Sequence, residues 1–355
     1  MHLGTAALLD FYRAHRDEQS LVLATIIATA GSTYRKPGAM MLISRGGQYA
    51  GLISGGCLEG DLLHHAERVF EDAAPSFVTY DMHADEELVW NLGLGCDGVI
   101  HLLLQRLDKE ADFGFLGRLQ ASHEARRAAL LALVTQSNGR LPSGAWGWLD
   151  SGDISEGEPS LVAILREMAR EWPDWRFQFV RLGQDAQAES IVIHLPAPTR
   201  VLICGAGPDA APMARALAEL DWEVVVTDHR AAFARAERFP PGCTVLQGRP
   251  ERLSEGLDLE SLDAAVIMSH HLEYDGSYLR QLAQFPIPYI GVLGPSARRD
   301  RLMDLAGCRD RTIYGPIGLD IGAELPGAIA LAAAAEIHAV LNQRSGTPLT
   351  RQVDE

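Results

Sequence analysis

A cysteine on a glycine turn is the first feature of the sequence that could do chemistry. Cys57 follows Gly55 and Gly56 in the stretch SGGCLEG, and the residues after it have the spacing of an amphipathic helix. Gly55, Gly56, Cys57 and Glu59 are the candidate ligand contacts of this turn. The positive end of a helix dipole favours a thiolate, whereas Glu59 acts in the opposite sense. Two interpretations stay open: Cys57 is a thiolate that meets a ligand or acts as a nucleophile, or it is a small residue packed where glycines leave little room.

A second glycine-rich loop of the N-terminal half, GSTYRKPGA over residues 31–39, carries two cations. Arg35 can grip a phosphate with its planar fork, and Lys36 can act as a point charge. Ser32 and Thr33 add hydroxyl groups to the same loop. We therefore expect a phosphate-bearing ligand to meet this loop, while a thiolate on the SGGCLEG turn would suit a soft metal or metal–sulfur chemistry.

The other cysteines and the histidines give weaker signals. The loop NLGLGCDG repeats the glycine-rich style around Cys96, but Asp97 beside it disfavours a thiolate. Cys204 ends an apolar strand and is interpreted as structural. His270 follows the run AAVIMS at the carboxyl end of a predicted strand, where open α/β sheets bind ligands. Its alternative role is capping or loop packing.

The sequence GAGPDA at residues 205–210 matches the dinucleotide-binding fingerprint GxGxxG/A. Gly205 would permit the tight turn, and Gly207 would let the backbone approach a diphosphate at the start of a helix. Asp228, at the end of the next strand, would accept hydrogen bonds from ribose hydroxyls. Asp209 opposes this interpretation, because its carboxylate would compete with a phosphate for the same N–H groups. An NAD(P) site is one hypothesis, and a Rossmann-shaped domain that uses no dinucleotide is the other.

The predicted helices and strands that must position these groups follow different patterns in the two halves of the chain. Up to residue 107, hydrophobic patterning predicts helices and strands at residues 2–18, 21–29, 40–44, 49–54, 58–72, 77–82 and 98–107. Residues 108–128 and 137–160 are charged or rich in Gly, Ser and Pro, and we interpret them as surface insertions. Trp146 and Trp148 are expected to pack rather than to bind. No internal repeat is evident.

After the proline-containing segment LPAPTR, apolar runs alternate with helical segments, which predicts a parallel sheet. The expected fold class is therefore α/β: an N-terminal α/β domain over residues 1–195, a Rossmann-like parallel-sheet domain over residues 200–345, and a polar tail over residues 346–355. The segment GPIGLDIGAELPGAIAL leads into a long apolar helix, expected in the core or at a subunit contact. Asp320, between its glycine turns, is expected to orient backbone groups.

Composition excludes several classes of function. The chain has 355 residues and a formal charge of −16, which argues against nucleic-acid binding and against docking on anionic membranes. The five cysteines are widely spaced without a CxxC pair, which is typical of a reducing cytosol. The N-terminus lacks the basic region of a signal peptide, and no apolar run has the length of a membrane span. We expect a cytoplasmic protein, and a homodimer is the oligomer favoured by base rates.

Several motifs together resemble one known family. GSTYRKPGAMML, SGGCLEG and NLGLGCDG resemble the N-terminal motifs of the XdhC/CoxI family, the xanthine dehydrogenase accessory proteins. VLICGAG, VTDHR, MSHHLEYD and GPIGLDIGAELPGAIAL resemble its C-terminal Rossmann-like domain, in the family's order. The sequence departs from the family pattern after GAG, at Ser269-His270-His271 and at Gly294-Pro295-Ser296. These departures all lie in the C-terminal part of the chain.

The resemblance implies a chaperone for the molybdenum cofactor that holds the cofactor while sulfur replaces an oxo ligand. It implies delivery to a molybdenum hydroxylase apoenzyme and cooperation with a cysteine desulfurase. The family's GGC cysteine, tied to holding the cofactor, falls on Cys57, and its basic loop falls on Arg35 and Lys36. The alternatives from other classes are an NAD(P)-dependent oxidoreductase with His270 as acid or base, and a transferase with Cys57 as nucleophile.

Overall fold

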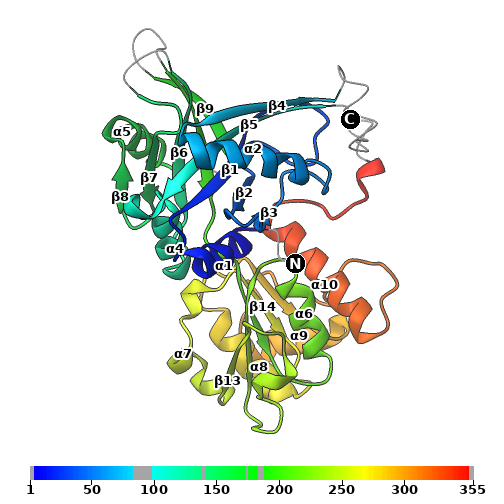
Figure 1. Cartoon of the computed structure of the whole chain (residues 1–355). Helices are drawn as coiled ribbons and strands as arrows, with labels where there is room; N and C mark the ends of the chain where they lie inside the picture. Colours follow the sequence, from blue (N-terminus) through cyan, green and yellow to red (C-terminus); the bar gives the residue numbers. More distant parts are fainter. Residues whose placement is uncertain (1–3, 83–97, 138–140, 173–174, 183–187, 352–355) are drawn as a thin grey trace. The chain divides into compact units, whose positions relative to one another are not determined.

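The structure, a computed structural model, describes residues 4–82, 98–137, 141–172, 175–182 and 188–351. The chain divides into two compact units, Met1–Ala197 and Pro198–Glu355 (Figure 1). The first unit contains antiparallel sheets with helices, and the second contains a parallel, Rossmann-like sheet. The predicted fold class is therefore confirmed. Within the described residues, every helix is too short or too polar to cross a lipid bilayer.

The first unit begins with helix α1 and a five-stranded antiparallel sheet, called sheet A, with strand order β3-β2-β1-β5-β4. Helix α2 connects β3 to β4. Its apolar positions follow helical spacing, and the chain leaves it through a left-handed Ala73. The bounds are α1 Thr5–His15, β1 Ser20–Gly31, β2 Met40–Ile43, β3 Tyr49–Gly51, α2 Glu59–Asp72, β4 Ser76–Asp81 and β5 Gly98–Asp108.

The same arrangement then occurs a second time. Helix α4 leads into sheet B, whose strand order β8-β7-β6-β10-β9 has the topology of sheet A, and helix α5 connects β8 to β9. The bounds are α4 Leu116–Glu124, β6 Ala129–Ser137, β7 Trp146–Asp150, β8 Ser155–Gly157, α5 Pro159–Met168, β9 Phe177–Leu182 and β10 Ala188–Leu195. The first unit is thus an internal repeat, and the expectation of no repeat was wrong.

Backbone details establish the equivalence of the two copies. Gly51 and Gly157 end equivalent strands with φ of +92° and +98°, and a Cβ on either would collide with a carbonyl oxygen of the neighbouring strand. The contacts between the copies are reciprocal: Gly38 lies against the side chain of Ile193, and its counterpart Gly144 lies against Gln105, the counterpart of Ile193. Such exchange of equivalent contacts is the mark of a two-fold relation.

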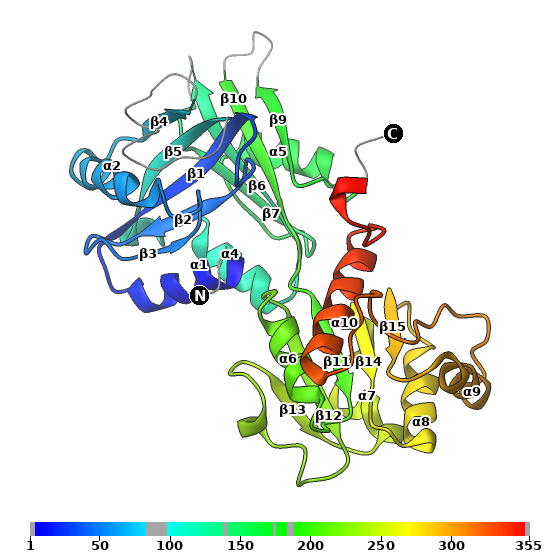
Figure 2. The ribbon, with the colours of Figure 1, turned by 90° about the vertical axis from the view of Figure 1, so that its right-hand side faces the viewer.

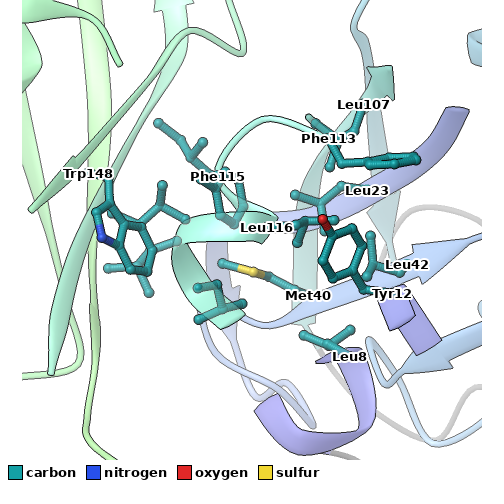
Figure 3. Close-up of a cluster of buried hydrophobic side chains, with 14 of the residues drawn as sticks. Leu8, Tyr12, Leu23, Met40, Leu42, Leu107, Phe113, Phe115, Leu116 and Trp148 are labelled. Carbon is teal, nitrogen blue, oxygen red and sulfur yellow. The ribbon is translucent and has the colours of Figure 1, made fainter. Parts of the chain in front are cut away.

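The two sheets pack face to face, and each carries its own helix on the outside. The shared core includes Leu23 and Leu42 from sheet A and Trp148 from sheet B (Figure 3). Helix α2 covers the outer face of sheet A, and α5 covers the outer face of sheet B (Figure 2). The two segments interpreted as surface insertions are therefore part of sheet B and of the helix that leads into it. Residues 108–128 contain α4, and residues 137–160 contain β7 and β8 with the turns beside these short strands. Trp148 is fully buried, as expected of a packing residue.

The second unit is a five-stranded parallel sheet with order β13-β12-β11-β14-β15. Helices α6 and α10 cover one face, and α7, α8 and α9 cover the other. Chain order reverses between β11 and β14, the place where such sheets bind ligands. The bounds are β11 Arg200–Cys204, α6 Ala210–Ala218, β12 Glu223–Asp228, β13 Thr244–Gln247, α7 Leu253–Gly256, β14 Ala264–Ile267, α8 Leu272–Leu282, β15 Tyr289–Val292, α9 Ser296–Ala306 and α10 Pro326–Leu341.

The repeat makes a prediction about stability. Replacing Gly51 or Gly157 by alanine imposes a left-handed residue and a collision with backbone, so each change should cost about 3 kcal/mol of unfolding free energy. Gly47→Ala is the control, because Gly47 also has positive φ but has open space where its Cβ would stand. It should cost about 1 kcal/mol. Urea unfolding of the three variants tests this, and an equal loss for all three would contradict it.

Candidate functional site

The SGGCLEG turn is built on a buried network between Ser54 and Glu59. The Glu59 side chain is 1% exposed, and its Oε1 accepts the backbone N–H groups of Ile53 (3.1 Å) and Ser54 (2.8 Å). The Ser54 hydroxyl donates to Glu59 Oε2 at 2.6 Å. The same hydroxyl oxygen accepts the N–H groups of Gly56, Cys57 and Leu58. Every backbone donor of the turn from Ile53 to Leu58, Gly55 excepted, is therefore held by these two side chains.

This network presents Cys57 rather than burying it. Gly55 and Gly56 are exposed, Gly56 has φ of +107°, and Cys57 is partly exposed at the residue that precedes Leu58, the N-cap of α2. Cys57 is thus a partly exposed residue of an ordered turn at a helix start. Glu59, the other side chain of the turn with a group that could contact a ligand, has both carboxylate oxygens engaged inside the turn. Its role in the structure is to hold the backbone that carries Cys57.

The charge of Glu59 is stabilised in place. Burial raises the pKa of the Glu59 carboxyl, but the hydrogen bonds from Ser54 and Ile53 outweigh burial, and the pKa is lowered below its ordinary value. Glu59 is therefore ionised at neutral pH. A carboxylate that accepts this many hydrogen bonds is a rigid anchor for a turn.

The basic loop lies between β1 and β2. Thr33 is buried, and its hydroxyl donates to the carbonyl oxygen of Arg35 at 2.9 Å, which shapes the turn. Ser32 and Lys36 are exposed, and Arg35 is partly exposed. Within the described residues, Arg35 and Lys36 form no ion pair.

The sheet brings these loops to one end of the first unit. Gly31, the last residue of β1, pairs with Gly98, the first residue of β5, so the basic loop lies beside the start of β5. The start of α2 lies at the same end, because Tyr80 near the end of β4 donates to Asp61 in the first turn of α2. The other end of α2 lies at the opposite end of sheet A, where Arg106 donates to the Phe70 carbonyl. Cys96 and Asp97 lie outside the described residues.

The glycine turn of the second unit has the predicted shape. Gly205 has φ of +113°, and a Cβ there would stand 2.6 Å from the backbone of Ser269 at the end of β14. Arg238, a residue that no sequence motif singled out, donates to the Ala206 carbonyl at 2.7 Å and also reaches the Gly207 carbonyl. The turn is therefore held by the backbone of Ser269 on one side and by the Arg238 guanidinium on the other.

Asp228 is used by the protein itself. Its side chain is 1% exposed, and its oxygens accept from the Ala206 N–H at 2.8 Å and from the backbone and guanidinium of Arg230. Burial raises the pKa of this carboxyl, but the hydrogen bonds from Arg230 and Ala206 outweigh burial and lower it overall. Both oxygens are engaged, so the structure offers ribose hydroxyls no free acceptor at Asp228.

Asp209 occupies the approach to the same turn. A Cβ on Gly207 would stand 2.8 Å from Asp209 Oδ1, so the space that Gly207 leaves is filled by this carboxylate. Asp209 Oδ2 lies 2.8 Å from Nε2 of His270, which has a left-handed φ of 63° and is well exposed. Pro208 further removes one N–H donor. The residues present therefore do not fit a dinucleotide diphosphate.

Asp320 does not join this group. It is exposed in the loop between α9 and α10, which borders a cavity of about 580 Å³. Glu336, which sequence reasoning missed, orients that loop instead: its carboxylate accepts the Gly318 N–H at 3.0 Å and the Tyr289 hydroxyl. Cys204 is fully buried, and burial raises the pKa of its thiol, which suits a structural residue. Within the described residues, no three His, Cys, Asp or Glu side chains form a metal site.

Comparison with known proteins gives one consistent result. The family model "XdhC and CoxI family" matches residues 14–81, which include the basic loop and Cys57, and the model "XdhC Rossmann domain" matches residues 201–337. The chain is 30% identical over 338 residues to a Bacillus subtilis protein named as a probable subunit of xanthine dehydrogenase, covering 90% of this chain and 93% of that protein. The chain belongs to the XdhC and CoxI family.

Two further relatives agree with this membership. A crystal structure described as a xanthine dehydrogenase from Bacillus halodurans is 27% identical, with a TM-score of 0.79, and covers 98% of this chain and 99% of that one. The uncharacterized protein YqeB of Escherichia coli is 30% identical over 170 residues, which are 45% of this chain and 30% of YqeB. The family resemblance predicted from the sequence motifs is therefore confirmed.

The anchoring role of Glu59 predicts a pH dependence. Because folding lowers the Glu59 pKa, its contribution to stability is complete above its unfolded value of about 4.3 and is lost as the pH falls through the lower folded value. Glu59→Gln should lower stability at neutral pH and lose less of it than the wild type between about pH 5 and pH 3. Unfolding free energies across this range test the claim. Glu67→Gln, on the exposed face of α2, should keep the wild-type slope.

The engagement of Asp228 predicts a structural rather than a nucleotide phenotype. Asp228→Asn removes acceptors from Ala206 and Arg230 and should cost about 2 kcal/mol of unfolding free energy. Glu223→Gln, on the same strand but in a partly exposed pair with Arg200, should cost under about 1 kcal/mol. Thermal melts with and without NAD and NADP provide the measurement. If either nucleotide stabilised the wild type but not Asp228→Asn, Asp228 would bind the ribose hydroxyls after all, and this prediction would be wrong.

Proposed function

We propose that this protein holds the molybdenum cofactor during replacement of an oxo ligand by sulfur and delivers it to a xanthine dehydrogenase-type molybdenum hydroxylase. Family membership supports this proposal, as do relatives named for xanthine dehydrogenase. A cysteine desulfurase is the expected source of sulfur, and the hydroxylase apoenzyme is the expected recipient. A cytoplasmic homodimer is the form we expect. The protein is proposed as a carrier and not as an enzyme.

The observation that carries the proposal is a difference between the two copies of the repeat. In the second copy, β8 ends at Gly157 and α5 begins at Pro159, so one residue connects them. In the first copy, the equivalent Gly51 is followed by seven residues before α2 begins at Glu59, and Cys57 is among them. The fold closes without this segment in the second copy. The glycine–cysteine turn is therefore an addition to the fold, and its order is maintained by the buried Ser54–Glu59 network.

The chemistry of the available groups fits such a cargo. The cofactor is an anionic, phosphate-bearing pterin whose metal has sulfur ligands, and it supplies the redox centre of the recipient enzyme. Cys57 would contribute a soft sulfur ligand from its exposed turn. Arg35 and Lys36, with the Ser32 hydroxyl, would bind the phosphate from the loop at the same end of sheet A. A single protein ligand to the metal also permits release, which delivery requires.

The alternatives receive less support from the geometry. An oxidoreductase would need the Rossmann turn for NAD(P), where Asp209 and Asp228 are already engaged with His270 and Arg230. A transferase would need a base beside Cys57, and the nearest carboxylate in the turn, Glu59, has both oxygens committed. No observation favours either function over the carrier.

The test is the cofactor content of protein purified from cells that make the cofactor. Cys57→Ser should retain at least tenfold less molybdenum and pterin than the wild type, because the metal loses its sulfur ligand. Cys243→Ser is the matched control, since Cys243 is also a partly exposed free cysteine but lies in the second unit. Equal molybdenum in wild type and Cys57→Ser would remove Cys57 from the site. Absence of both molybdenum and pterin from the wild type would remove the proposed function.

A further inference from the structure

A second candidate site lies between the two copies of the repeat, away from Cys57. A cavity of about 560 Å³ opens between sheets A and B and is lined by both members of several equivalent pairs of residues. A cavity of this size is typical of small-molecule sites. Because equivalent residues face each other across it, the cavity lies on the two-fold axis that relates the copies.

The backbone on both sides of the cavity is irregular in the same way. In sheet A the register between β1 and β5 shifts between Ile26 and Ala28, which leaves Ile27 as a bulge. In sheet B the register between β6 and β10 shifts at the equivalent place, which leaves Thr135 as a bulge. Both bulged residues line the cavity. Bulges occur next to functional sites, where they redirect side chains and interrupt pairing.

Two exposed aromatic rings provide apolar walls. Phe77 on β4 and Phe179 on β9 occupy equivalent positions on the outermost strands of the two sheets, and both line the cavity. They are 52% and 55% exposed, which is high for phenylalanine in a unit whose other large apolar side chains are mostly buried. Exposed aromatic faces at a cavity are suited to stacking with a planar ring.

The polar groups of the cavity differ between the two copies. On the sheet A side, His101 Nδ1 lies 2.9 Å from the Thr79 hydroxyl, which fixes the imidazole ring. The equivalent position in sheet B is Glu189, whose carboxylate lies 3.4 Å from Arg181 in an exposed pair. Exposed pairs contribute little stability, so Glu189 can exchange this partner for a ligand. Within the described residues, the lining of the cavity contains no lysine or arginine.

We propose that this cavity binds a planar fused heterocycle with a 2-amino-4-oxopyrimidine edge, the group that pterins and guanine share. The ring stacks on Phe77 and Phe179, and the adjacent N–H donors of its pyrimidine edge bind the Glu189 carboxylate. The proposal does not rest on the cofactor-carrier function, because a ring of this kind could belong to a pterin or to a free purine.

The site is separate from the Cys57 turn. Phe77, Thr79 and His101 alternate along their strands with Val78, Tyr80 and Ile100, which pack under α2 on the outer face of sheet A. The cavity therefore opens on the inner face of sheet A, and the Cys57 turn lies with α2 on the outer one. Variants of the cavity should leave the cofactor content set by Cys57 unchanged.

The experiment is a calorimetric titration of the full-length protein with 6-carboxypterin, guanosine and lumazine. We expect saturable binding of 6-carboxypterin, of guanosine or of both. The compound that binds shows whether the ring is a pterin or a purine. Phe179→Ala should weaken binding about tenfold or more, the loss typical of a missing aromatic stack. Glu189→Gln should weaken binding of the amino-oxo rings but not of lumazine, which lacks the amino group.

Controls keep the outcome interpretable. Phe179 and Glu189 are exposed, so their variants should melt with the wild type, and Trp172→Ala removes an exposed aromatic of the same unit that does not line this cavity. Trp172→Ala should bind like the wild type. Absence of saturable binding by either amino-oxo ring, or equal affinities in Phe179→Ala and Trp172→Ala, would overturn the proposal.

Discussion

The first unit depends on the burial of one face of each sheet against the other. Helices α2 and α5 cover the outer faces, whereas α1 and α4 add side chains to the core between the sheets. The remaining apolar surface of each inner face is buried against the other sheet. The inner faces must therefore meet, and they do so by reciprocal contacts in which Gly38 lies on Ile193 and Gly144 lies on Gln105. A methyl group at Gly38 would stand 3.1 Å from the Ile193 side chain, which is a tight contact across the interface. Two copies of one motif thus form a single core, and neither copy would be complete alone.

Comparison of the two copies of the repeat also separates residues that the fold requires from residues that serve a function. What both copies share is what closure of the sheets demands: left-handed glycines at strand ends, equivalent bulges and equivalent helices. Between its third strand and its helix, the first copy has a seven-residue segment around Cys57 where the second copy has one residue. The first copy therefore carries the added chemistry on its outer end, while the plane between the copies carries a cavity whose two halves have diverged to His101 and Glu189.

The sequence predicted the individual helices and strands better than the relation between the two copies of the repeat. Continuous apolar runs and helical spacing placed β1, α2, β5 and the parallel strands near their observed positions, since burial imposes these patterns directly. The repeat was missed because many equivalent positions carry different residues: Met40 corresponds to Trp146, although the left-handed glycines and the pair Phe77 and Phe179 are kept. The turns of the second copy, rich in Gly, Ser and Pro, then resembled insertions. At the site, the thiol and cations were predictable from residue type, but the Ser54–Glu59 network was not, because Glu59 looks like a surface residue until the turn folds over it.

The second unit shows how a fingerprint can keep its shape after its usual ligand no longer fits. Gly205 is required because the turn passes against Ser269, a constraint of the fold that holds with or without a nucleotide. Asp228 has the expected position, yet Arg230 two residues later and the Ala206 N–H satisfy it internally. Asp209 fills the space over Gly207 and binds His270, whose left-handed backbone is costly and is stabilised by this contact. The groups that would bind a diphosphate in other Rossmann domains here bind each other, so the turn is a structural joint between α6, β12 and β14.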